Sequence, residues 1–131
     1  MTIARAEAII PMTPGADHSA ATQEGLFVKL NAAGNPIVVV SATATVPFGI
    51  ILDGEAVTGQ DSIGVCGGNF GPARVRAGAA VTKGSYGQLE SDGAVINDAG
   101  AGARIVVCLF LESGVADELV QAVILTPVQY T

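Results

Sequence analysis

The feature that most constrains the fold is a regular succession of short apolar runs, rich in β-branched residues, from Gly25 onward. Gly, Asn, Asp and Pro separate these runs, and none of them has convincing helical periodicity. Strands of this length and spacing are typical of an all-β sandwich or barrel. We therefore predict a small antiparallel β-barrel or sandwich with strands over residues 26–30, 36–40, 48–52, 62–66, 73–77, 86–90, 94–97, 104–111 and 118–125.

An internal similarity is the second feature: residues 20–54 align with residues 79–113 at a constant offset of 59, without a gap. Nine of the 35 aligned positions are identical, where this composition gives roughly three by chance. The identical pairs include Gly25/Gly84, Leu30/Leu89, Gly34/Gly93 and Ile37/Ile96. The alignment favours two pseudo-repeated halves. A half of about 60 residues is marginal alone, so the two halves are expected to share one core.

Two strands, 104–111 and 118–125, are apolar on both faces. A small antiparallel sheet normally keeps one face in water. Two explanations remain open at this point. The strands lie at the centre of a closed barrel covered by loops and the N-terminal segment, or their outer face is buried against another subunit.

The first 24 residues differ in composition from the rest, with Pro11, Pro14 and Gly15 and a polar run after them. We predict an N-terminal arm over 1–24 and a β-barrel domain over 25–131; a frayed terminus or a first strand of the same sheet remains the alternative for the arm. The candidate interface residues, taken from the arm and from the two-faced strands, are Ile3, Ile9, Ile10, Val106, Phe110, Val120 and Ile124.

Charge and length exclude several classes of protein. A chain of 131 residues has room for about one domain. Its net charge of −6 argues against nucleic acid and anionic membranes as partners, because both are bound mainly through Lys and Arg. The uncharged stretch between Lys29 and Asp53 contains Pro36 and Pro47, which break a membrane helix. The first residues lack the pattern of a secretory signal, so we expect cytosolic synthesis.

The metal-binding residue types are scarce. One His and two Cys cannot supply the four ligands of a structural zinc site. Cys66 and Cys108 lie within apolar runs, which favours buried, reduced thiols over a disulfide. Asp53, Glu55 and Asp61 lie close together in the sequence but lack the alternating spacing of a calcium loop, so a solvated acidic loop is favoured over a cation site.

Catalytic patterns are also missing from the sequence. His18 lies between Asp17 and Ser19, but a catalytic triad needs side chains that converge from separate elements. The glycine-rich segment 64–71 is followed by no helix and no Lys-Ser/Thr pair, so it predicts turns and bulges and no phosphate site. We expect no catalytic residue, no cofactor and no metal, and therefore no enzyme.

The segment from Arg76 to Pro127 resembles the C-terminal half of the small capsid decoration, or cement, proteins of tailed bacteriophages. The shared phrases are an A-G-x-A-V-x-K-G run, an apolar strand ending L-E-S-G, and a closing apolar strand. They correspond here to Ala77–Gly84, Leu111–Gly114 and Asp117–Leu125. The first-half sequence VPFGIILDGEAVTGQDSIGVCGG is similar to the strand pair of the same family, so the resemblance covers residues 25–127.

This resemblance implies a virion structural protein made of β-barrels, on the outer surface of an icosahedral capsid. The implied partners are the major capsid protein, whose adjacent subunits it would clip together, and further copies of the chain itself, a trimer being favoured over a dimer. The alternative is a carbohydrate- or small-molecule-binding β-domain. Sugar binding usually needs exposed aromatic rings, and only Phe70 and Tyr130 are free enough to serve.

Overall fold

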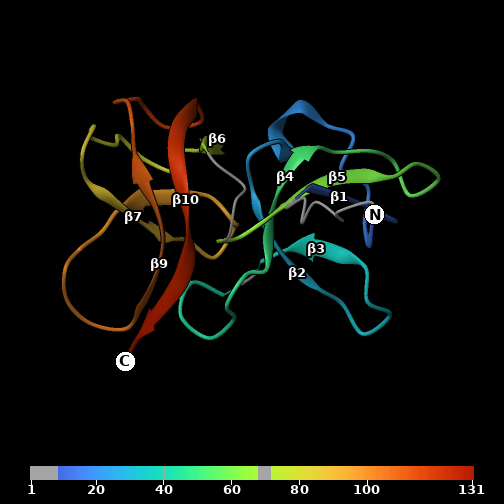
Figure 1. The fold of residues 1–131 in the computed structure, drawn as a ribbon, viewed down its shortest axis with the longest axis horizontal. Coiled ribbons are helices and arrows are strands. Elements are labelled where there is room, and N and C mark those ends of the chain that lie inside the picture. Colours follow the sequence, from blue (N-terminus) through green and yellow to red (C-terminus); the bar gives the residue numbers. More distant parts are fainter. Residues whose placement is uncertain (1–8, 40, 68–71) are drawn as a thin grey trace, which may run out of the picture.

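The computed structural model describes residues 9–39, 41–67 and 72–131, and this part of the chain is all-β apart from a 3-10 helix at Ala21–Gln23 (Figure 1). Each of the nine predicted strands overlaps an observed one. The strands are β1 (Ile9–Met12), β2 (Phe27–Leu30), β3 (Pro36–Val38), β4 (Gly49–Asp53), β5 (Asp61–Val65), β6 (Pro72–Arg76), β7 (Tyr86–Leu89), β8 (Val95–Asn97), β9 (Arg104–Phe110) and β10 (Leu119–Tyr130).

Each half of the chain builds one five-stranded antiparallel sheet. The strand order is β1-β5-β4-β2-β3 in the first sheet and β6-β10-β9-β7-β8 in the second, so adding five to each label converts one order into the other. The two sheets lie side by side in Figure 1, the first half in blue to green and the second in yellow to red. The common strand order confirms the prediction of two similar halves.

The strand register repeats with the offset seen in the sequence. Phe27 pairs with Ile50 in the first sheet, and Tyr86 pairs with Leu109 in the second. The turns repeat too: Gly34 and Gly93, which follow β2 and β7, both have φ = +82°. This left-handed conformation favours glycine, which explains why both positions kept it.

The two apolar clusters are unequal in size. The main cluster lies in the second half and takes in three side chains from the first half, Phe27, Val39 and Ile50. A smaller cluster of Val28, Ile51 and Ile63 lies on the opposite face of the first sheet. The face of the first sheet that carries Phe27 and Ile50 therefore packs against the core of the second half, as expected of halves too small to fold alone.

The two-faced strands bury one face in the main cluster of the same chain, while Leu109 and Val123 on the other face are half-buried. Between β7 and β9 the register shifts by one residue, so the consecutive residues Val107 and Cys108 are both fully buried in the main cluster. Such a β-bulge explains an apolar run without alternation. A second irregularity, between Ile124 and Val128, carries β10 past Pro127 to Tyr130, beyond its predicted end at residue 125. Proline is tolerated at such an irregularity.

The segment predicted as an N-terminal arm is described from Ile9 onward, and this part belongs to the first sheet. β1 pairs antiparallel with β5. Further along, the Gly15 amide donates to the Pro36 carbonyl, and His18 is only 2% exposed. Of the interpretations left open by the sequence, a first strand of the sheet describes residues 9–12, and residues 13–24 pack onto the body of the fold.

Both cysteines carry free thiols, as expected. Cys108 is buried in the main cluster and Cys66 packs against it. Burial raises the pKa of each thiol to about 12. Among the described residues no helix has the length and apolar character needed to cross a membrane.

Candidate interaction surface

An apolar row crosses the outer face of the second sheet. Tyr86 of β7 pairs with Leu109 of β9, and Leu109 pairs with Val123 of β10. Directly paired residues of antiparallel strands point to the same face, so these three side chains form one continuous row. Tyr86 is 53% exposed, and Leu109 and Val123 are half-buried. This outer row is a candidate contact surface.

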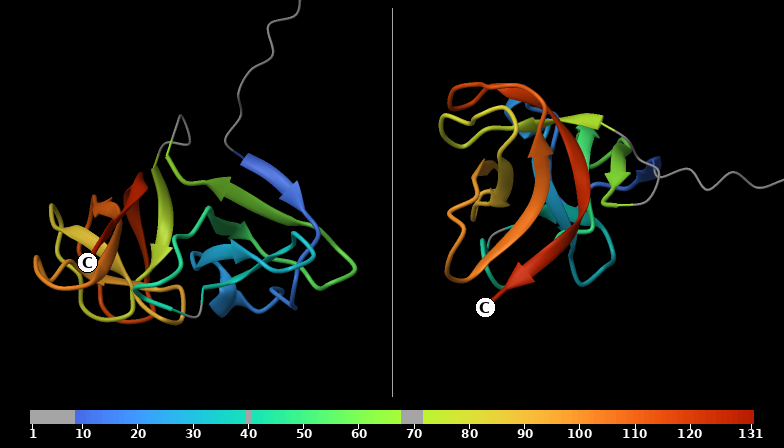
Figure 2. Two further views of the ribbon diagram at one scale, coloured as in Figure 1. Left: turned by 90° about the horizontal axis from the view of Figure 1, so that it is seen from below. Right: turned by 60° about the vertical axis from the view of Figure 1, so that its left-hand side comes forward.

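The corresponding row of the first sheet is covered. Phe27 and Ile50 occupy the positions of Tyr86 and Leu109, and both are fully buried in the main cluster. The same face of the same fold is thus closed by the second half in one case and left open in the other. Figure 2 shows the two sheets from two further sides.

Backbone hydrogen bonds hold the two halves together at this covered face. The Phe27 amide donates to the Gly93 carbonyl over 2.9 Å, and the Arg76 amide donates to the Gly25 carbonyl over 3.0 Å. The Arg76 side chain adds three hydrogen bonds, all to backbone carbonyls, at Ala21, Glu24 and Asp117. The guanidinium group is thereby committed to the junction between the halves.

A cleft of about 410 Å³ opens beside Arg76 at this junction. Its lining is Thr22, Gln23, Leu26, Val38, Val39, Arg76, Gly78, Ser91, Asp92, Ala94 and Asp117. No aromatic ring is among these residues, so the cleft lacks the stacking platform typical of sugar sites.

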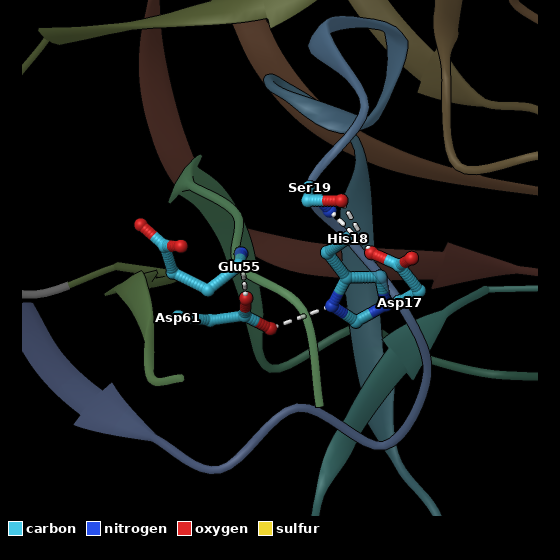
Figure 3. A network of polar contacts seen from close by, with 5 residues as sticks. All are labelled: Asp17, His18, Ser19, Glu55 and Asp61. Carbon is cyan, nitrogen blue, oxygen red and sulfur yellow. Dashed lines mark hydrogen bonds and ion pairs between the residues drawn. The ribbon is translucent and has the colours of Figure 1, made fainter. Parts of the chain in front are cut away.

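A buried polar pair ties the N-terminal segment to the first sheet (Figure 3). His18 Nδ1 lies 2.5 Å from Asp61 Oδ2, and the two side chains are 2% and 0% exposed. A carboxylate only accepts hydrogen bonds, so Nδ1 carries the proton that is donated. The second carboxylate oxygen, Asp61 Oδ1, accepts from the Glu55 amide over 2.7 Å. Asp61 is therefore fully buried with partners on both oxygens.

The pair has two members of a hydrolase triad, but among the described residues no nucleophile bonds to the histidine. His18 Nε2 is buried without a hydrogen-bond partner among the described residues. The neighbouring hydroxyl, Ser19 Oγ, donates instead to Asp17 Oδ1 over 2.6 Å, as a dashed line in Figure 3 shows. The hydrogen bonds from Ser19 lower the pKa of Asp17. The geometry fits a structural role for His18.

The second half has an apolar pair at the same place. The His18 amide donates to the Glu55 carbonyl, and the Val81 amide donates to the Gly114 carbonyl, 59 residues after Glu55. In the same way Val120 lies 59 residues after Asp61, within the matching strand. Val81 and Val120 are both buried in the main cluster.

The structure revises the expectation for the acidic residues near β5. Asp61, predicted in a solvated loop, is the fully buried first residue of β5 and binds His18. Within the described ranges no three His, Cys, Asp or Glu side chains gather where a metal ion could bind. The sequence missed the His18–Asp61 pair because 43 residues separate its members.

The predicted interface residues fall into three groups. Ile3 lies outside the described residues. Ile9 is 50% exposed on the edge strand β1, and Ile10 is half-buried against the smaller cluster. The remaining four, predicted to face a partner, are instead buried within the chain itself: Val106, Phe110, Val120 and Ile124 are 7%, 1%, 1% and 5% exposed. Phe110, Val120 and Ile124 belong to the main cluster of the same chain, so their burial needs no second subunit.

The aromatic residues considered for sugar binding are placed only in part. Phe70 lies outside the described residues. Tyr130 is 43% exposed, and its ring is covered on one side by the Arg104 guanidinium at 4.2 Å from the centroid. The exposed aromatic residue that sequence reasoning passed over is Tyr86. The alignment of Tyr86 with Phe27 was the sequence signal that could have drawn attention to this residue.

Comparison with known proteins identifies a shared fold. No protein family model matches the sequence, and no curated protein matches it. Among solved structures, the chain is similar to the N base of the head fiber protein gp8.5 of bacteriophage phi29. The TM-score is 0.59 with 18% sequence identity, and the match covers 88% of this chain and 93% of that one. The two-sheet fold described above is therefore shared with a bacteriophage head fiber base over nearly the full length of both chains.

Proposed function

We propose that this chain is a non-enzymatic virion structural protein of a tailed bacteriophage. The observation that carries the proposal is the fold shared with the phi29 head fiber base, which extends over 88% of the chain. The sequence resemblance of residues 25–127 to capsid decoration proteins supports the same class of protein. Both similarities concern proteins of phage heads.

The finer role that we propose is attachment to the outer surface of the capsid. There the protein would bind the major capsid protein as a homo-oligomer, a trimer being favoured, and clip adjacent subunits together. A net charge of −6 is compatible with an exterior position, where no packaged DNA has to be bound. The exposed row at Tyr86 and Leu109 offers apolar area for contact with other proteins.

Stabilisation of the shell follows from mass action. A protein that binds the assembled capsid and not its dissociated subunits stabilises the assembly by RT ln(1 + [L]/Kd), about 4 kcal/mol per site at a thousandfold excess over Kd. The effect is repeated at every occupied site. The role requires a folded body and contact surfaces, and it uses no reactive side chain.

Cosedimentation with purified phage heads tests the proposal. Phage heads that are expanded, undecorated and filled with DNA are mixed with labelled protein and pelleted. We expect saturable binding at a fixed number of copies per head. Binding to closed heads would assign the protein to the exterior. Prior saturation with unlabelled protein is the control and should abolish the signal. Protein that stays in the supernatant at concentrations up to tens of micromolar would contradict capsid attachment.

A further inference from the structure

The outer row of the second half lacks the cover that its counterpart has. Three pairs of positions, each 59 residues apart, compare the covered face with the open one: Phe27/Tyr86, Ile50/Leu109 and Leu52/Leu111. Phe27 and Ile50 are fully buried, and Leu52 packs against the main cluster. Tyr86 is 53% exposed and Leu111 is 37% exposed. The second half thus presents the surface by which the first half docks, but with nothing docked on it.

The first half, in turn, lacks what the second half receives. The second half accepts Phe27 beside the β7–β8 hairpin, where the Gly93 carbonyl binds the Phe27 amide and Leu89 belongs to the main cluster. The matching hairpin of the first half is β2–β3. Its Leu30, the counterpart of Leu89, is 48% exposed, whereas Leu89 is 1% exposed. The first half therefore carries a second receiving surface, and no part of the chain that the structure describes covers its Leu30 in the way that Leu89 is covered.

Four glycines show the same contrast at the level of the backbone. A Cβ atom at Gly93 would lie 2.9 Å from the Phe27 carbonyl oxygen, and one at Gly25 would lie 2.9 Å from the Arg76 amide nitrogen. At their counterparts, Gly34 and Gly84, a Cβ atom would meet nothing within 4 Å. All four have positive φ between 82° and 86°, so the backbone has the same shape where the contact is made and where it is missing.

We infer that the chain associates with itself head to tail, the outer row around Tyr86 of one copy docking on the β2–β3 hairpin around Leu30 of the next. This contact would repeat, between copies, the junction that joins the two halves within one copy. The inference rests on the homo-oligomer of the proposed function and names its contact surfaces. A second copy is the occupant because the chain already shows this face covered by a unit of its own fold.

A contact of this kind is heterologous, since two different surfaces meet. Heterologous contacts close into a ring when the rotation between copies allows it and otherwise extend into a filament. In a ring every copy uses both of its surfaces, and the assembly has a defined mass. Filaments would give a mass that rises with protein concentration.

Light scattering coupled to size exclusion tests the inference with three single variants. Tyr86→Asp places a charge in the outer row, and Leu30→Asp places one in the receiving hairpin. We expect the wild type to be an oligomer at micromolar concentration and each of these variants to be a 13.1 kDa monomer. Val57→Asp is the matched control because Val57 is an equally exposed apolar residue, 56%, in the β4–β5 loop outside both surfaces. It should keep the wild-type mass.

Mixing the two variants separates a head-to-tail contact from a symmetric one. Tyr86→Asp protein keeps an intact hairpin and Leu30→Asp protein keeps an intact outer row, so an equimolar mixture should form a heterodimer of two chains that grows no further. Circular dichroism and thermal unfolding of each variant verify the fold.

Three results would overturn the inference: a monomeric wild type, an unchanged oligomer in Leu30→Asp, or a mixture that stays monomeric. A monomeric wild type that still cosediments with phage heads would refute self-association while leaving the proposed capsid attachment in place. An oligomer that fails to bind heads would do the reverse.

Discussion

In the first half of the molecule, His18 and Asp61 form a buried polar pair where the second half buries Val81 and Val120. The strand order around the two sites is the same, and the His18 amide binds the Glu55 carbonyl as the Val81 amide binds the Gly114 carbonyl. The fold therefore accepts two chemically opposite solutions at one position. The strand order depends on the backbone pairing, whereas the side chains at this position affect the stability of the fold.

The two solutions differ in how they respond to loss of one member. A buried charged or polar pair loses the hydration of both groups, and only the interaction between the two groups compensates for that loss. Removing one partner therefore lowers the stability of the fold strongly. An apolar pair loses packing alone. The first half adds a second dependence, because Asp61 also binds the Glu55 amide and so fixes the β4–β5 loop.

The largest expected effect is that of His18→Ala. This variant leaves the fully buried Asp61 with the Glu55 amide as its remaining partner, and we expect the free energy of unfolding to fall by about 3–5 kcal/mol. Urea denaturation monitored by circular dichroism measures the change.

The double variant His18→Val/Asp61→Val copies the second half and is the matched control. It removes both members of the pair, so it should regain most of the stability lost in His18→Ala, less about 1–3 kcal/mol for the unsatisfied Glu55 amide. A double variant as unstable as His18→Ala would show that the two halves are not interchangeable at this position.

A smaller effect compares the two hairpin glycines. Gly34→Ala puts a side chain at φ = +82° in open space, which costs about 1–2 kcal/mol for the left-handed backbone alone. Gly93→Ala carries the same backbone cost and also forces its Cβ atom against the Phe27 carbonyl oxygen and Val38, so we expect a further 1–3 kcal/mol, roughly. Thermal and urea unfolding of both variants give the difference. Equal losses of stability in the two variants would contradict a contribution from the contact between the halves.

The smallest effect concerns the two thiols. The folded chain holds the pKa of Cys66 and Cys108 at about 12, above the ordinary value of 9.0. The folded state thus keeps protons that the unfolded state releases from about pH 9 upward, and stability falls as the pH rises through this range. The slope is at most about 1.4 kcal/mol per pH unit and thiol.

Urea unfolding at pH 8, 9 and 10 measures that slope. Cys66→Ala/Cys108→Ala is the control, and its stability should fall less steeply between pH 9 and 10 because it has no thiol protons to release. An identical slope in the control would assign the pH dependence to other groups.

The fold was largely predictable because β-branched runs and turn residues act locally. The nine runs from residue 26 onward became strands, and the offset of 59 predicted two similar halves, which the strand order confirms. β1 was predicted only as an alternative to an arm, because IIPM contains a proline and its strand depends on pairing with β5. The end of β10 was missed because an irregular pairing carries it past Pro127.

The candidate surface was harder to predict. Counting apolar residues in strands 104–111 and 118–125 predicted a partner-covered face that included Val106, Phe110, Val120 and Ile124. In the structure Phe110, Val120 and Ile124 point into the main cluster, and the open apolar row lies on the opposite face at Tyr86 and Leu109. Which face of a strand that is apolar on both sides enters the core is decided by packing against other strands, so the pattern of a single strand cannot reveal it.

The all-β class and the positions of nine strands could be predicted from the sequence because strand and turn propensities are local, and the two halves could be predicted because the same local pattern occurs twice. The contact of His18 with Asp61, and the burial of Phe27 where Tyr86 is left open, became visible in the folded chain. Two copies of one motif have the same local propensities. When the outer face of the first half packs on the second half, the outer face of the second half and the receiving hairpin of the first half stay uncovered. This outcome depends on how the two halves pack, which no local pattern contains.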